Sequence, residues 1–141
     1  MELFLKKNET FSPTIKDGEI LYIPNFKKKN VADLLLEKLE NTIPWRQDKI
    51  RVYGKTYDQP RLTSLHSIQQ KPYTYSNITM QPRAMTYELL QILTEIERIK
   101  PNSYNSVLLN LYRNGKDSNG WHADNESALG INPSIASLSL G

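Results

Sequence analysis

The chain of 141 residues contains no cysteine. Disulfide bridges and thiolate metal sites are therefore excluded, so any metal must be held by nitrogen and oxygen ligands. The absence fits a reducing compartment, and we expect an intracellular protein of the cytoplasm or nucleus. Histidine is nearly as scarce, since the sequence has two, His66 and His122.

Long apolar runs are also lacking. No stretch approaches the roughly 20 apolar residues of a membrane-spanning helix, and the apolar run within Met1–Lys7 is too short for a signal peptide. We therefore expect a soluble protein that does not bind membranes. Its length suits a single domain over residues 1–141, and the sequence contains no repeat, linker or low-complexity tract.

Charge of either sign is moderate. Lysine and arginine outnumber aspartate and glutamate by 18 to 15, which gives a net charge of +3. The densest basic run, Lys27–Lys29, precedes a predicted helix, where such a run is more often a solvated face than a phosphate site. The charge permits a nucleic-acid partner without requiring one.

The hydrophobic pattern predicts an α+β domain. One helix is expected over Val31–Asn41, with Asn30 as its N-cap, and a second over about Arg83–Lys100, between two prolines. Their apolar stripes comprise Val31, Leu34, Leu35 and Leu39 on the first helix, and Met85, Leu89, Leu93 and Ile96 on the second. Extended segments are predicted at residues 19–23, at 50–57 with a turn near Gly54, from Pro60 onward, at 106–112 as a mostly buried strand, and at 134–140.

His122 and Asp124 form a His-x-Asp pair. Side chains two residues apart on extended backbone project to the same side, so both can reach one cation. The facial triad of non-haem iron oxygenases uses two histidines and one carboxylate, so a third ligand is required. His66 lies in a segment predicted to be a solvent-exposed loop and is not expected to supply it. In isolation the pair is equally compatible with a surface histidine beside a turn aspartate.

Six ordered blocks carry a resemblance to a known family. They are Pro60–Thr63, Tyr73–Ser76, Asn110–Gly115, Trp121–Glu126, Leu129–Gly130 and Ile135–Gly141. Together they resemble the AlkB-like oxidative dealkylases, which use Fe(II), 2-oxoglutarate and O2 to remove alkyl groups from nucleic-acid bases. The resemblance implies an incomplete double-stranded β-helix, or jelly roll, which lacks its C-terminal strands and has N-terminal helices packed on one sheet. It also implies a monomeric DNA repair enzyme that acts on alkylated DNA or RNA.

The resemblance assigns roles to four residues near the His-x-Asp pair. His122 and Asp124 would be iron ligands. Asn110 and Tyr112 would contact 2-oxoglutarate, since an amide and a phenol two apart on one strand face can both hydrogen-bond a carboxylate. Without the family context, Asn110 and Tyr112 would be an inward-facing polar pair.

Other positions match substrate contacts of the family. Tyr75, with Tyr73 beside it, resembles the aromatic residue that stacks on a flipped base, and Glu126 resembles the acidic residue that reads its polar groups. The alternatives are strand tyrosines packed on a sheet and an ordinary loop glutamate.

The hairpin residues Val52, Tyr53 and Gly54 resemble the element that probes the base stack, and Arg61 could meet a phosphate. A simple structural turn is the alternative. One departure is that Ser64–Ser67 follows Pro60–Thr63, where the family has an aromatic residue and a glycine.

In the family, the strand resembling Ile135–Gly141 leads to a second iron histidine and to arginines that this sequence does not contain. We therefore expect a C-terminally truncated chain that binds iron poorly and turns over slowly, if at all. Two alternatives are a non-catalytic remnant that binds nucleic acid through Tyr53 and Tyr75, and an oxygenase acting on a protein or small molecule.

Overall fold

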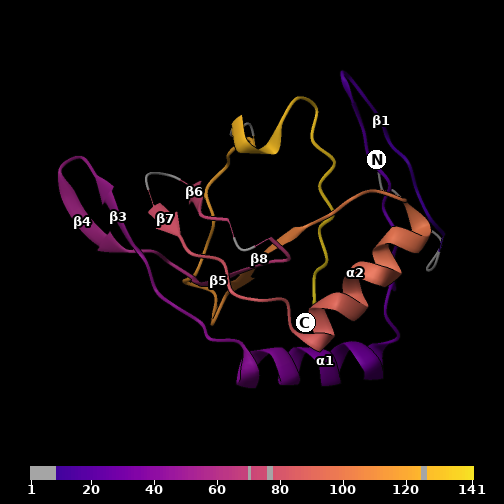
Figure 1. The fold of residues 1–141 in the computed structure, drawn as a ribbon, viewed down its shortest axis with the longest axis horizontal. Coiled ribbons are helices and arrows are strands. Elements are labelled where there is room, and N and C mark those ends of the chain that lie inside the picture. The colour runs from indigo at the N-terminus through magenta and orange to yellow at the C-terminus, as the bar shows by residue number, and fades with distance from the viewer. Residues whose placement is uncertain (1–8, 70, 76–77, 125–126) are drawn as a thin grey trace. The chain divides into compact units, whose positions relative to one another are not determined.

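The computed structural model describes residues 9–69, 71–75, 78–124 and 127–141. Within these ranges, eight strands form four two-stranded antiparallel sheets, accompanied by two α-helices and a short 3-10 helix (Figure 1). The sheets pair β1 with β2, β3 with β4, β5 with β8, and β6 with β7. This set of elements agrees with the predicted α+β class.

Contacts divide the chain into two compact units. The first comprises residues 1–39 with 139–141, and the second comprises residues 40–138. The expectation of one domain over residues 1–141 stays a prediction. In the first unit, β1 (Thr14–Ile15) and β2 (Gly18–Glu19) form a short ribbon, which an isolated bridge between Phe11 and Tyr22 extends. The strand predicted at residues 19–23 is thus much shorter.

Helix α1 covers Lys29–Thr42, so it begins before Asn30. Asn30 therefore lies inside the helix, and its predicted role as the N-cap is wrong. The predicted apolar stripe is only partly buried, because Leu39 is 7% exposed whereas Val31 and Leu34 are 44% and 67% exposed. Periodicity determines which residues share a helix face, but it does not determine what covers that face.

The hairpin predicted around Gly54 is confirmed, with β3 at Lys49–Val52 and β4 at Lys55–Asp58. Tyr53 and Gly54 form its turn with φ angles of 48° and 77°. Positive φ at both central residues is typical of the type I′ turn, whose twist matches that of the flanking strands. Figure 1 shows this hairpin projecting away from β5 and β8.

Strand β5 (Leu62–Ser67) pairs with β8 (Ser106–Leu111), which places Thr63 directly opposite Asn110. Every residue of β5 from Thr63 to Ser67 is buried. Strand β8 ends one residue before the predicted strand, and it is exposed or half-buried rather than mostly buried.

The expectation that His66 lies in an exposed loop is wrong, because His66 is a β5 residue that is 2% exposed. Its Nδ1 lies 2.7 Å from the carbonyl oxygen of Ala84, and its Nε2 lies 3.0 Å from the Ser64 hydroxyl. Burial of a polar ring is tolerated when both nitrogens have partners. With both nitrogens occupied, His66 does not offer a metal ligand.

Helix α2 covers Tyr87–Ile99 and begins later than predicted. Thr86 is its N-cap, since the Thr86 hydroxyl accepts a hydrogen bond from the backbone N–H of Leu89 at 3.3 Å. Met85 therefore lies outside the helix, while Leu89 is 3% exposed and anchors the buried face.

The remaining elements are β6 (Tyr73–Tyr75), β7 (Ile78–Met80) and the 3-10 helix η1 (Ser127–Leu129). The strand predicted at residues 134–140 is not formed, because no strand among the described residues pairs with it. In the described part of the chain, no helix combines the length and apolar character needed to cross a membrane.

Candidate metal and co-substrate site

The loop that joins β8 to the His-x-Asp segment is closed by an ion pair. Arg113 donates through Nε to Oδ2 of Asp117 at 2.8 Å and through Nη2 to Oδ1 at 3.0 Å. The backbone N–H of Arg113 also donates to Oδ2 at 2.9 Å. These bonds from the Arg113 side chain and backbone lower the pKa of Asp117 from 3.8 to about 2. Asp117 is therefore ionised and paired with Arg113 at neutral pH.

The same loop is fastened to the start of β5. The backbone N–H of Ser118 donates to the carbonyl oxygen of Pro60 at 2.8 Å, and Nη1 of Arg61 donates to the carbonyl oxygen of Ser118 at 3.3 Å. Both bonds join segments more than fifty residues apart in the sequence. They hold the chain four residues before His122.

The structure brings His122 and Asp124 together. Nε2 of His122 lies 3.4 Å from Oδ1 of Asp124, and the two side chains are 40% and 43% exposed. Nδ1 of His122 lies 2.8 Å from the carbonyl oxygen of Gly120. A carbonyl only accepts, so Nδ1 carries a proton, and Nε2 is the ring nitrogen on the side of Asp124.

This arrangement fits part of an iron site. Neighbouring ligands of a first-row divalent ion, each bound at about 2.1 Å, lie about 3 Å apart, close to the observed separation. A bond from the second ring nitrogen to a carbonyl is the usual support of a ligating histidine. Among the described residues, no group of three or more His, Cys, Asp or Glu side chains could hold a metal ion. His122 and Asp124 thus offer two ligands of a site that needs a third.

Asn110 lies on β8 next to its last residue, Leu111, and Tyr112 follows the strand directly; both side chains are exposed. Nε of Arg61 donates to Oδ1 of Asn110 at 3.0 Å. Arg61 therefore links Asn110 to Ser118 and, through it, to the loop before His122. Tyr112 is 47% exposed directly after the strand.

Arg61 itself is 4% exposed. Arg61 was expected to meet a phosphate, whereas in the structure its guanidinium lies against Asn110 and Ser118. The role of Arg61 in substrate binding stays a prediction. Its bonds could not be read from the sequence, because the partners lie 49 and 57 residues away.

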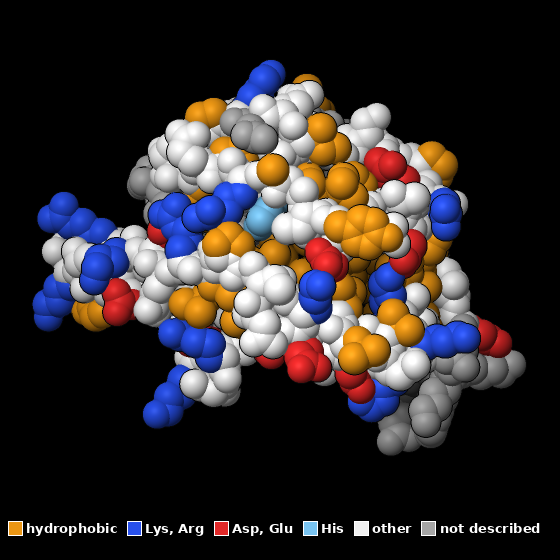
Figure 2. Space-filling model, turned by 60° about the horizontal axis from the view of Figure 1, so that its bottom comes forward, with side chains coloured by type: hydrophobic (Ala, Val, Ile, Leu, Met, Phe, Trp, Pro, Cys, Tyr) orange, Lys and Arg blue, Asp and Glu red, His pale blue; other side chains and the backbone are white. Residues whose placement is uncertain are grey.

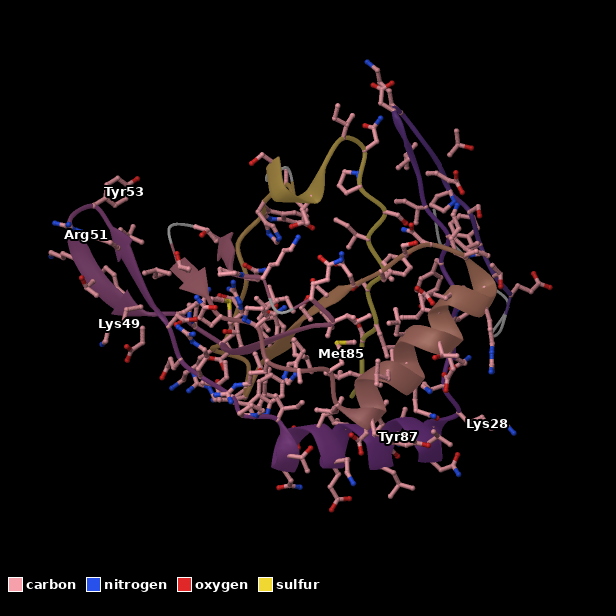
Figure 3. The ribbon with its side chains drawn as sticks, viewed as in Figure 1. Lys28, Lys49, Arg51, Tyr53, Met85 and Tyr87 are labelled. Carbon is pink, nitrogen blue, oxygen red and sulfur yellow. The ribbon has the colours of Figure 1, made fainter. Side chains whose placement is uncertain are left out.

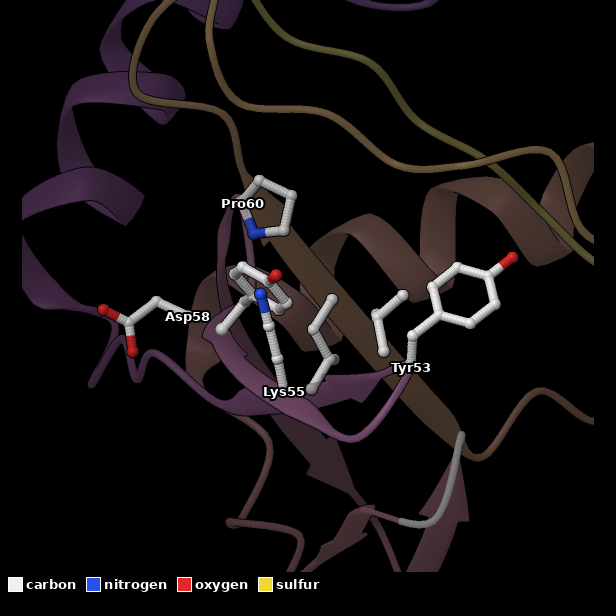
Figure 4. Close-up of a pocket in the computed structure, with 7 residues that line it drawn as sticks. Tyr53, Lys55, Asp58 and Pro60 are labelled. Carbon is white, nitrogen blue, oxygen red and sulfur yellow. The ribbon is translucent and has the colours of Figure 1, made fainter.

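The predicted substrate contacts Val52, Tyr53 and Gly54 lie on the hairpin formed by β3 and β4. The Tyr53 side chain is fully exposed, and Figure 3 shows it at the tip of the hairpin with Arg51 beside it. An open, largely apolar pocket lies on this hairpin, and Figure 4 shows it. It is lined by Ile50, Val52, Tyr53, Lys55, Tyr57, Asp58 and Pro60. Gly54 completes the turn.

Basic side chains lie along the same hairpin, and one of them, Lys55, lines the pocket. Lys49, Arg51 and Lys55 are all exposed, and Lys49 pairs with Asp58 at 3.0 Å. In Figure 2 the left-hand projection, which is the same hairpin, carries several lysine and arginine side chains. Exposed aromatic and basic groups on one element are typical of a surface that meets a nucleic-acid strand.

The structure places Tyr73 and Tyr75 on β6 by their backbone, whereas their side chains and all of Glu126 lie outside the described residues. The substrate roles expected for these three residues therefore stay predictions.

Residues 19–141 match the model of the 2OG-Fe(II) oxygenase superfamily. The chain is 44% identical over 133 residues to "Alpha-ketoglutarate-dependent dioxygenase alkB homolog 3" of Homo sapiens, covering 94% of this chain and 46% of that protein. It is 35% identical over 134 residues to "DNA oxidative demethylase ALKBH2" of Arabidopsis thaliana, covering 88% and 41%. These matches confirm the AlkB-like resemblance. The chain spans about half the length of the curated relatives it matches.

Proposed function

Because this chain belongs to the 2OG-Fe(II) oxygenase superfamily, we propose that the whole protein oxidatively removes alkyl groups from nucleic-acid bases, as a repair dioxygenase. The relatives named alkB homolog 3 and DNA oxidative demethylase support this reaction class. The observation that carries the proposal is the His122–Asp124 pair, whose Nε2 and Oδ1 atoms lie 3.4 Å apart.

In this proposal His122 and Asp124 hold Fe(II), which together with 2-oxoglutarate and O2 supplies the oxidation of the alkyl carbon. The bond from Nδ1 of His122 to Gly120 orients the ring so that Nε2 is the nitrogen that faces Asp124. Asn110 and Tyr112 donate hydrogen bonds to 2-oxoglutarate carboxylate oxygens. The loop between Tyr112 and His122 is tied to the start of β5 by the bonds of Ser118 with Pro60 and Arg61.

The substrate is an alkylated base in DNA or RNA. Base chemistry requires the base to leave its stack, and Tyr53 on the hairpin is suited to occupy or cover the gap. Tyr73, Tyr75 and Glu126 would contact the extruded base, and Val52 and Gly54 would support strand binding. In this proposal the chain forms an incomplete jelly roll with its helices packed on one sheet, and the whole protein is a monomer of the nucleus or cytoplasm.

The test is an assay with a single-stranded oligonucleotide that carries one N-methylated base. With Fe(II), 2-oxoglutarate and air, we expect formaldehyde, succinate and the unmodified base, detected by mass spectrometry. Because the chain spans about half of its relatives' length, the assay uses both the chain and the full product of its source gene. Asp124→Ala is the inactive control.

Two outcomes would replace the proposal. Succinate formation without demethylation of any DNA or RNA oligonucleotide would indicate an oxygenase for another substrate class. Binding of the oligonucleotide without succinate formation, in the full gene product, would favour a non-catalytic nucleic-acid-binding protein.

A further inference from the structure

Arg61 is the most deeply buried arginine among the described residues, at 4% exposure. Its Nε donates to Oδ1 of Asn110 at 3.0 Å, and its Nη1 donates to the carbonyl oxygen of Ser118 at 3.3 Å. A guanidinium has donors and no acceptor. The Asn110 atom that faces Arg61 must therefore be the amide oxygen, and the opposite orientation would bring two donors together.

This contact fixes what Asn110 presents to its surroundings. With Oδ1 held by Arg61, the NH2 group of Asn110 lies on the other branch of the carboxamide, and the residue is exposed. In the part of the chain that the structure describes, Arg61 provides the one side-chain bond to this carboxamide. Two free N–H donors complement a carboxylate, whereas a flipped amide would present its oxygen to the anion and repel it.

The partners of Arg61 are neutral, in contrast to those of Arg46. Arg46 is half-exposed and pairs with the buried carboxylate of Asp48, which is an ordinary charge pair. Arg61 is more deeply buried but bonds one amide and one backbone carbonyl. Burying a guanidinium against neutral acceptors is costly, so a purely stabilising role does not account well for its place.

We propose that Arg61 is a positioning residue for co-substrate binding, which holds the Asn110 carboxamide with its NH2 group turned toward a carboxylate of 2-oxoglutarate. The inference rests on the proposed function. Arg61 also bonds Ser118, in the loop that precedes His122. One side chain thus contacts both the segment that would bind the co-substrate and the segment that leads to the metal ligands.

The first test is a double-mutant cycle on 2-oxoglutarate affinity, measured by calorimetry with Mn(II) present. We expect Arg61→Met to weaken binding about tenfold, the effect of losing one well-placed hydrogen bond. In an Asn110→Ala background, Arg61→Met should cause no further loss, because its effect acts through Asn110. Additive losses would overturn the inference, since Arg61 would then act directly or by general destabilisation.

Arg46→Met is the matched control. It also removes an arginine from a buried partner in the same compact unit, but it touches neither Asn110 nor Ser118. We expect it to lower the melting temperature while leaving the affinity for 2-oxoglutarate unchanged. An equal loss of affinity in Arg46→Met would overturn the positioning role.

A second readout needs no co-substrate. In the ¹⁵N-labelled protein, the side-chain NH2 signals of Asn110 should shift in Arg61→Met and stay in place in Arg46→Met. Unchanged Asn110 signals in Arg61→Met would overturn the inference whatever the affinity data show. If the signals shift as expected but the full gene product does not bind 2-oxoglutarate, the proposed function fails and the co-substrate role of Arg61 fails with it.

Discussion

Nε2 of His122 lies 3.4 Å from Oδ1 of Asp124, while Nδ1 of the same ring bonds the carbonyl oxygen of Gly120 at 2.8 Å. One nitrogen is thus held by the backbone and the other is directed to the carboxylate. This is how a histidine is prepared to share a metal with its neighbour.

We expect His122→Ala and Asp124→Ala each to weaken Mn(II) binding at least about tenfold, because even the loss of an outer-shell partner of a metal ligand has this effect. Electron paramagnetic resonance of Mn(II) titrations measures the affinity. Asp58→Ala is the control, since Asp58 is an exposed acid on the hairpin. Equal Mn(II) affinity in all three variants would show that His122 and Asp124 are not metal ligands.

Tyr53→Ala should weaken binding of single-stranded DNA by about 1–3 kcal/mol, the usual contribution of one aromatic that stacks on a base. Stability should change by no more than about 0.5 kcal/mol, because the side chain is fully exposed. Fluorescence anisotropy with a labelled oligonucleotide measures the affinity. Tyr87→Ala, which removes a 71% exposed tyrosine from α2, should leave it unchanged. A similar loss in both variants would contradict a specific role for the hairpin tip.

His66→Phe should destabilise the fold by about 1–3 kcal/mol, since it leaves buried polar partners unsatisfied. The carbonyl oxygen of Ala84 can only accept, so Nδ1 of His66 donates to it and Nε2 accepts from the Ser64 hydroxyl. Urea denaturation measures the change. Ser64→Ala, which removes the partner of Nε2 alone, should cost less. Metal affinity should be the same in both variants, because His66 is no metal ligand.

The Arg113–Asp117 ion pair predicts the pH below which the loop loses its stabilisation by this pair. Bonds from the Arg113 side chain and backbone lower the pKa of Asp117 from 3.8 to about 2. Since the pKa in the folded protein lies below the ordinary value, the pair's contribution is fully present above about pH 4 and is lost as pH falls through about 2.

Carbon-13 NMR of the Asp117 carboxyl should follow this titration. In Asp117→Asn, the backbone N–H of Arg113 should exchange faster at neutral pH, because the charged acceptor at 2.9 Å is gone. Asp58→Asn, which breaks an exposed pair on the hairpin, should not affect that exchange. A titration midpoint of Asp117 near the ordinary aspartate pKa would show that the Arg113–Asp117 ion pair does not form in solution.

Local sequence determined those features whose partners are close along the chain. Tyr53-Gly54 between two extended runs predicted the hairpin, because only a few turn types join adjacent strands and glycine readily adopts positive φ. The spacing of His122 and Asp124 likewise predicted their proximity, since two residues of backbone settle it.

Features that depend on remote partners were decided by the tertiary structure. The segment around His66 was expected to be a loop, yet His66 lies on the buried strand β5, because β8 and the Ala84 carbonyl satisfy its polar groups. Arg61 was expected to meet a phosphate, yet it is buried against Asn110, 49 residues away. A polar side chain can be buried wherever the fold supplies its hydrogen-bond partners. Residue type and periodicity do not show which residues, tens of positions away in the sequence, will be those partners.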